Sequence, residues 1–246
     1  MSSRRKFPAL VDTTAAADDI SLRMSHPSIV LIHGAWHRAA CWHKVVAGLG
    51  ERGLTVNAVE LPFEGFATDV AAARAAIVAA GDGAVVVGHS YGGAVLSAAA
   101  SGLRKPTHLV YLCAFMLAEN EDMGELTSQY PMPLFGLLQV VDGRTVVDQD
   151  GAVDMFYGDC SAYDVRIALE QLRPMPWSEP PAGTRAAWRD VPSTYVLCTE
   201  DRTIVPELQR HMARHATEVV EWPTSHSPFL SEPQRLVELL TRLVST

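Results

Sequence analysis

Residues 84–97 read AVVVGHSYGGAVLS, in which a Gly-x-Ser-x-Gly motif at 88–92 joins an apolar run to a run of small residues. The run at 84–87 predicts a buried strand, and the residues from Tyr91 onward predict a helix. Between two such elements the motif predicts a sharp turn that lifts the hydroxyl of Ser90 above a sheet, with glycines where a side chain would collide with backbone. The alternative is an ordinary strand-to-helix turn whose glycines serve only packing.

Strand and helix candidates alternate along the chain on both sides of this motif. Short β-branched runs predict strands at 29–33, 55–60, 84–88, 108–112, 194–198 and 218–221. Runs rich in Ala, Leu, Arg and Glu predict helices at 40–50, 69–80, 91–102, 206–215 and 233–244. Because parallel neighbours need a crossover, the alternation predicts the α/β class, with a mostly parallel six-stranded sheet and helices on both faces.

The same patterns divide the 246 residues into a short extension and one large domain. Residues 1–26 show no sustained periodicity and predict a flexible N-terminal extension, with the domain at 27–246. Between about 115 and 192 the alternation stops, and Pro, Met and aromatic residues accumulate. We predict that this insert forms a lid, with a helix at 162–172 that Ser161 caps.

The composition argues against several kinds of partner. A formal charge of -8, with no basic run beyond residues 4–6, disfavours nucleic acid. The four cysteines lack the spacing of zinc sites and the density of a disulfide scaffold, so we expect free thiols in a reducing compartment. No run has the length of a membrane span or the pattern of a signal peptide. We therefore expect a cytoplasmic protein with no membrane partner, and we leave a homodimer open.

A serine hydroxyl is a weak nucleophile at neutral pH, so the motif needs a histidine that accepts its proton. In chains that use this motif, the acid and then the histidine follow the serine. Of nine histidines, only His226 stands between the strand at 218–221 and the final helix. The alternative for His226 is a loop histidine bonded to backbone. His211 and His215 lie four residues apart on a predicted helix, but we expect no carboxylate beside them and predict that they are solvated.

The acid is expected after the strand at 194–198, where Glu200 and Asp201 offer two carboxylates. The shorter side chain favours Asp201, whereas Glu200 is expected to face solvent or to pair with Arg202. Asp201 would hold the imidazole in one tautomer without itself transferring a proton. The alternative for Asp201 is to cap the helix that begins near Pro206.

An attacked carbonyl develops a negative oxygen that needs preorganised donors. One donor is predicted to be the amide of Tyr91, at the start of the helix that follows Ser90. The loop after the first strand, residues 33–36, is expected to supply the second donor through the amide of Ala35, because Gly34 lets the backbone approach the substrate.

Several short motifs outside the serine turn point to one known family. They are HGA at 33–35, His37, CWHKV at 41–45, LP at 61–62, GHSYGG at 88–93 and CTED at 198–201. As a set they resemble the plant methylesterase and hydroxynitrile lyase family of α/β-hydrolases, and similar bacterial esterases, over about residues 28–244. The resemblance implies the α/β-hydrolase fold, a triad of Ser90, Asp201 and His226, oxyanion donors at Ala35 and Tyr91, and no metal or organic cofactor.

The departures from the family pattern separate its activities. Lyases of this family place a threonine after the first loop histidine and a lysine after the catalytic one, where this chain has Gly34 and Ser227. Cyanohydrin cleavage is therefore disfavoured. Glu60 stands where the family usually has aspartate, and the sequence offers no account of its effect.

We therefore expect a serine hydrolase that cleaves small carboxylic esters carrying an apolar group, through an acyl-enzyme. A lactonase, a cyclase, a hydroxynitrile lyase-like enzyme on the same residues, or a non-catalytic ligand receptor remain as alternatives. The apolar residues of the insert suggest a pocket for an aryl or alkyl group. The residues predicted to bind substrate are Trp36, Met116, Phe135, Phe156 and Trp177.

Overall fold

The computed structural model describes residues 28–104, 106–176 and 185–245. The extension predicted at 1–26 lies outside the described residues. Within them, six strands form one sheet in the order β2-β1-β3-β4-β7-β8, and every neighbouring pair is parallel. The strands are β1 (Ser28–Ile32), β2 (Thr55–Val59), β3 (Ala84–His89), β4 (Pro106–Leu112), β7 (Ser193–Cys198) and β8 (Glu218–Trp222). The predicted strands and parallel sheet are confirmed.

Burial along each strand follows its place in the sheet. Every residue of the inner strands β3 and β7 is buried, because helices cover both faces of the sheet there. The two edge strands β2 and β8 alternate between more and less exposed residues instead. The continuous apolar runs in the sequence therefore mark the middle of the sheet.

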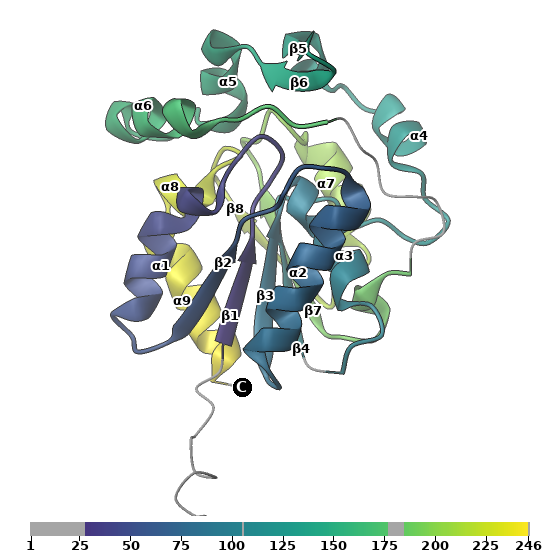
Figure 1. Cartoon of the computed structure of the whole chain (residues 1–246), viewed down its shortest axis with the longest axis vertical. Helices are drawn as coiled ribbons and strands as arrows, with labels where there is room; N and C mark the ends of the chain where they lie inside the picture. Colours follow the sequence, from purple (N-terminus) through teal and green to yellow (C-terminus); the bar gives the residue numbers. More distant parts are fainter. Residues whose placement is uncertain (1–27, 105, 177–184, 246) are drawn as a thin grey trace, which may run out of the picture.

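Helices lie on both faces of the sheet, as Figure 1 shows. On one face α1 and α9 pack against each other, and on the opposite face α2 packs against α3. The helices of this layer system are η3 (Ala39–Trp42), α1 (His43–Gly50), α2 (Phe66–Ala80), α3 (Tyr91–Ala100), α7 (Pro206–Ala213), α8 (Pro228–Ser231) and α9 (Pro233–Val244). The predicted helices are confirmed, with ends that differ by up to three residues, and with η3 as a separate turn before α1.

Within the segment between β4 and β7, residues 138–171 lie above the carboxyl ends of the strands in Figure 1, whereas residues 187–189 pack against α3 beside the sheet. We call residues 115–192 the cap. Its elements are α4 (Met123–Ser128), η4 (Pro133–Leu137), β5 (Leu138–Val141), β6 (Arg144–Val147), α5 (Gln149–Phe156), α6 (Ala162–Gln171) and η5 (Ala187–Arg189). Ser161 caps α6 by accepting a hydrogen bond from the amide of Asp164, as predicted. The other cap elements were not predicted.

Among the described residues, no helix combines the length and the apolar character that crossing a membrane requires.

Candidate active site

The turn between β3 and α3 holds Ser90 in a backbone conformation that few residues adopt. Its φ is 53° and its ψ is -123°, so the chain turns sharply at the serine, where the strand ends. A Cβ at Gly88 would lie 2.6 Å from the carbonyl oxygen of Gly92. A Cβ at Gly92 would lie 2.6 Å from the carbonyl oxygens of Ile32 and His33. Both glycines of the motif are therefore required by close backbone packing, as the sequence indicated.

Asp201 follows β7, and its carboxylate is held by four donors. One oxygen accepts hydrogen bonds from the amides of Thr203 (2.7 Å) and Ile204 (3.1 Å). The other accepts from Nε2 of Gln209 (2.9 Å) and Nδ1 of His226 (2.7 Å). Asp201 thus orders the turn before α7 and contacts the histidine, whereas the N-cap of α7 is Val205 with no side-chain cap bond, so the capping alternative is wrong.

His226 lies on the loop between β8 and α8 and is buried. Because its Nδ1 donates to Asp201, its Nε2 is the nitrogen left to act as a base. The ring of Phe156 lies 5.9 Å from the imidazole, and the ring of His89 lies 4.6 Å from it. Of the three residues expected in the order serine, acid and histidine, the acid and the histidine are therefore in contact through their side chains.

His89, the residue before Ser90 in the chain, contacts this pair. His89 donates a hydrogen bond from Nε2 to the carbonyl oxygen of His226 (2.8 Å), which fixes the histidine loop beside the end of β3. Among the described residues, no hydrogen bond joins the hydroxyl of Ser90 to the imidazole of His226. Catalytic hydrogen bonds of this kind often tighten only when substrate binds. The contact between Ser90 and His226 stays a prediction.

Ser90 lines a small pocket with a cavity volume of about 40 Å³. Ala35 and Tyr91, the two predicted oxyanion donors, line the same pocket. Within the described part of the chain, neither of their amides donates a hydrogen bond, so both are free to bind an oxygen atom. The described residues that line it are Ala35, Trp36, Ser90, Tyr91, Phe115, Met123, Thr127, Met132, Leu134, Phe135, Met175, Thr203 and Ile204.

The five residues predicted to bind substrate lie in different places. Trp36 and Phe135 line the pocket. Phe156 is buried behind it, stacked on Trp36 at 6.2 Å, and Met116 is fully buried in the core away from the lining. Trp177 lies outside the described residues. Sequence reasoning chose bulky residues without a way to tell which of them pack against the domain.

The alpha/beta hydrolase family model matches residues 29–239 of this chain. The chain belongs to the alpha/beta hydrolase family. Relatives of this hydrolase include a pyrethroid hydrolase of Sphingobium wenxiniae, 30% identical over 246 residues that cover 88% of this chain and 87% of that protein. A methylesterase-type chloroplastic protein of Arabidopsis thaliana is 28% identical over 247 residues, 87% of this chain and 56% of its own length.

A crystal structure of polyneuridine aldehyde esterase is similar in fold, with a TM-score of 0.77 and 20% identity over 89% of this chain and 98% of that one. These relatives confirm the resemblance to plant methylesterases and bacterial hydrolases. At this identity the solved structure bears on the fold alone.

The loop that follows β1 in this hydrolase is ordered by two neutral histidines. His33 donates from Nδ1 to the carbonyl of Gly34 (2.9 Å), and its Nε2 accepts from the amide of Leu61 (3.1 Å). His37 donates from Nδ1 to the carbonyl of Ala35 (2.7 Å), and its Nε2 accepts from the hydroxyl of Tyr157 (3.0 Å). Burial lowers the pKa of His33 to about 3 and that of His37 to about 4. Both therefore stay neutral, as their acceptor roles require.

The cap contacts each of the three loops that carry candidate site residues. Thr203, beside Asp201, donates its hydroxyl to the carbonyl of Met155 (2.8 Å). Asp159 accepts from the amide of Ser225 (3.1 Å) and also from the Ser225 hydroxyl, one residue before His226. The indole of Trp36 donates to the carbonyl and hydroxyl of Thr145 (3.2 and 3.1 Å). In this hydrolase, contacts from both the domain and the cap therefore hold these loops in place.

Gln209 is a residue of the site that sequence reasoning missed. It is fully buried on α7, where its Nε2 holds Asp201 and its Oε1 accepts from the amide of Cys198 (3.0 Å). A polar residue in the apolar face of a predicted helix was the signal that was available.

The prediction for His211 and His215 is wrong. Glu121 of the cap bonds to Nε2 of His211 (2.9 Å) and to Nε2 of His215 (3.3 Å). Trp188 stacks on His215 with ring centroids 4.6 Å apart. The chain brings a carboxylate to these histidines from a distant segment, so spacing on the helix could not reveal it.

Of the two arrangements expected for Glu200, exposure to solvent is the one found. Arg202 faces Asp154 at 4.0 Å.

Proposed function

We propose that this chain is a serine hydrolase that cleaves small carboxylic esters carrying an apolar group. The observation that carries the proposal is the bond between His226 and Asp201 beside the turn that presents Ser90 to the pocket. The esterase-type relatives support the same reaction class. A small-molecule ester is then the partner of the site.

The proposed reaction has two steps that use the same histidine. In the first, Nε2 of His226 takes the proton of the Ser90 hydroxyl while Oγ forms a bond to the ester carbonyl carbon. The tetrahedral intermediate collapses with loss of the alcohol, which receives that proton from His226. In the second, His226 takes a proton from water, which attacks the acyl-enzyme, and Ser90 leaves with its proton restored.

Two features lower the barrier of this reaction. Asp201 keeps the imidazole in the tautomer whose Nε2 is basic, and it stabilises the imidazolium that forms. The amides of Ala35 and Tyr91 bind the carbonyl oxygen as it becomes negative, and one such donor is worth about 2.7–4 kcal/mol of barrier.

The pocket favours an uncharged, apolar substituent. Among the described residues its lining has no charged side chain, and three of these residues are methionines, which adapt to ligands of different shape. Its two threonine hydroxyls already donate to backbone, Thr127 to Met123 (2.8 Å) and Thr203 to Met155 (2.8 Å). An apolar acyl or alkoxy group would fill this space without leaving a polar group unpaired.

Lyase chemistry is disfavoured by the space around Gly34. A Cβ there would lie 2.8 Å from Nδ1 of His89 and 3.0 Å from Cβ of Ser90, so the threonine of the lyases has no room. Ser227 stands at the position of the lyase lysine. It is fully buried and, unlike lysine, carries no positive charge. Lactonase and cyclase reactions use the same residues and are separated by substrate panels.

A fluorophosphonate probe tests the proposal directly. We expect the wild-type enzyme to be labelled at Ser90 and to hydrolyse 4-nitrophenyl butyrate, with both properties lost in Ser90→Ala. A folded wild-type protein that is not labelled would favour the ligand-receptor alternative. Retained hydrolysis in Ser90→Ala would refute Ser90 as the nucleophile.

We also propose a reducing, cytoplasmic location, which the four unpaired thiols support.

A further inference from the structure

The loop that carries the amide of Ala35 has its carbonyl groups fully engaged. The carbonyl of Gly34 accepts from Nδ1 of His33, and that of Ala35 accepts from Nδ1 of His37. The carbonyl of Trp36 accepts from the amide of Arg173 (2.9 Å), and that of His37 accepts from Nε of Arg173 (3.2 Å). Two of these four bonds therefore come from one residue of the cap.

Arg173 reaches three further groups around the same loop. Its Nη2 lies 2.8 Å from a carboxylate oxygen of Glu60, and the same nitrogen donates to the carbonyl of Leu61. Its guanidinium lies over the ring of Phe63, 4.2 Å from the centroid. The planar fork of arginine suits such divergent acceptors, which a lysine ammonium cannot reach together.

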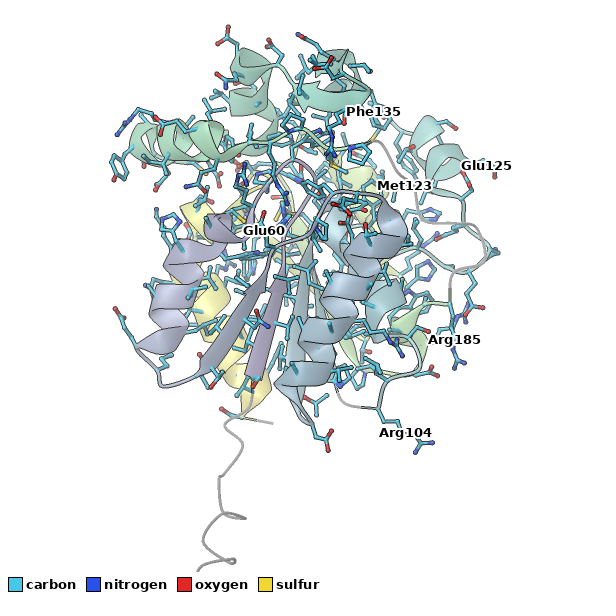
Figure 2. All side chains as sticks on the ribbon, in the orientation of Figure 1. Glu60, Arg104, Met123, Glu125, Phe135 and Arg185 are labelled. Atoms are coloured by element: carbon cyan, nitrogen blue, oxygen red, sulfur yellow. The ribbon has the colours of Figure 1, made fainter. Side chains whose placement is uncertain are left out.

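Glu60 completes the arrangement from the end of β2, beneath the cap in Figure 2. Its second carboxylate oxygen accepts from the amide of Ala39 (2.8 Å), two residues beyond His37. The longer side chain of glutamate lets one carboxylate bond to the loop and to Arg173 together. This is a structural account of the departure at position 60.

We propose that Arg173 is a positioning residue for the oxyanion donor, and that it places the amide of Ala35 through the carbonyls of Trp36 and His37. The proposal rests on the proposed function of the site. If Arg173 has this role, the oxyanion hole is complete only when the cap is docked on the domain. Trp36, whose φ of 59° is unusual for a residue with a side chain, is held in that conformation by Arg173 on its carbonyl and Thr145 on its indole.

Loss of the Arg173 side-chain bonds is expected to raise the free energy of the transition state more than that of the bound ester. The oxyanion bond strengthens as the carbonyl oxygen becomes negative, so a displaced Ala35 amide raises the barrier more than it weakens ground-state binding. A displacement of about 1 Å in a catalytic group can cost about 100-fold in rate. We therefore expect a loss in kcat with a small change in KM.

The test is Arg173→Met, which removes the guanidinium donors to the carbonyls of His37 and Leu61 and keeps an apolar chain over Phe63. The main-chain amide of residue 173 still bonds to the carbonyl of Trp36, so the variant isolates the contribution of the side chain. We expect kcat for 4-nitrophenyl butyrate to fall about 10–100-fold, with KM changed by less than about 3-fold. Affinity for butylboronic acid, whose tetrahedral adduct on Ser90 places an oxygen at the oxyanion site, should fall by a similar factor. Affinity for the uncleaved amide analogue of the ester should stay within about 3-fold. Equal losses for both ligands would show a merely structural role and overturn the proposal.

Arg38→Met is the matched control. Arg38 also bonds from the same loop region to the cap, through Nε to the carbonyl of Gln171 (3.1 Å), but it touches none of the four carbonyls at 34–37. We expect its kcat to stay within about 2-fold of wild type. A loss equal to that of Arg173→Met would mean that any weakening of cap docking suffices, which contradicts the assignment to Arg173.

Arg173→Lys covers the case in which the methionine variant does not fold. It keeps the charge opposite Glu60 and the main-chain bond to Trp36, but its ammonium cannot reproduce the side-chain bonds to the carbonyls of His37 and Leu61 together, so we expect the same selective loss of boronate affinity, smaller in size. Wild-type kcat in this folded variant would overturn the proposal. Failure of the proposed function is a separate result, because the wild-type enzyme would then show neither hydrolysis nor fluorophosphonate labelling.

Discussion

Nδ1 of His226 lies 2.7 Å from Oδ2 of Asp201, and Nε2 of Gln209 donates to the same oxygen at 2.9 Å. The carboxylate is therefore held from the side of α7 while it holds the imidazole. Because both residues are buried, solvent does not compete for this bond. The orientation of the proposed base depends on it.

Asp201→Asn keeps the shape of the site but presents an amide to the imidazole. An amide nitrogen facing Nδ1 would favour the tautomer whose Nε2 carries a proton and cannot act as a base. We expect kcat for 4-nitrophenyl butyrate to fall by about 10⁴-fold. Glu200→Gln, which alters the exposed neighbouring carboxylate, should leave kcat within about 2-fold. Similar losses in both variants would contradict the choice of Asp201.

Gly34→Thr introduces the side chain that the lyases carry. Because its Cβ would lie 2.8 Å from His89 and 3.0 Å from Ser90, we expect a loss of about 1–3 kcal/mol of unfolding free energy and no cleavage of mandelonitrile. Chemical denaturation and a cyanide assay measure these effects. Gly50→Ala, where an added Cβ meets nothing within 4 Å, should not lower stability. Lyase activity in the threonine variant would show that the loop has room after all.

The stability of the fold should fall as the pH is lowered below 6.5. Burial holds the pKa of His37 at about 4 in the folded state, whereas the unfolded chain titrates near 6.5. The unfolded state therefore binds the extra proton first, and stability that is fully present above pH 6.5 is lost as the pH falls toward 4. His37→Asn should reduce the slope of unfolding free energy against pH by up to about 1.4 kcal/mol per pH unit between pH 6.5 and 5. An unchanged slope in denaturation curves would show that His37 is not kept neutral.

An acyl chain that ends in a carboxylate should be a poor substrate. No charged side chain lines the pocket in the part of the chain that the structure describes, and an unpaired buried ion costs several kcal/mol. We expect kcat/KM for 4-nitrophenyl hydrogen succinate to be at least about 100-fold below that for 4-nitrophenyl butyrate. The methyl ester of the succinate controls for length, and high salt removes long-range repulsion by the net charge of -8. Equal rates for the acid and its methyl ester would contradict an uncharged pocket.

Sequence reasoning was strongest where local pattern decides structure. The runs at 84–88 and 194–198 became strands because their residues suit a sheet covered on both faces. The cap was predicted as an insert, but its helices and strands other than α6 were not predicted. Its hairpin β5–β6 turns at Asp142-Gly143, both with positive φ, and this pair is a known hairpin signal that was overlooked.

Contacts between distant segments were beyond the sequence. Asp201 and His226 could be ordered along the chain because the strand ends of a parallel sheet meet at one edge. Nothing comparable places Glu121 beside His211, or Arg173 beside Trp36, because these pairs depend on how the cap folds back. Of the cap residues that line the pocket, only Phe135 was among the residues predicted to bind substrate, for the same reason.

The proposed triad and most of the pocket wall come from separate stretches of this chain. Ser90, Asp201 and His226 follow three strands of the sheet, whereas most of the pocket wall comes from one continuous segment between β4 and β7. A homologue could therefore exchange that segment and inherit a new range of substrates with the chemistry intact. To keep the bonds that dock it here, the graft would carry a guanidinium at position 173 and a carboxylate at position 159, because both side chains bond to backbone groups of the recipient.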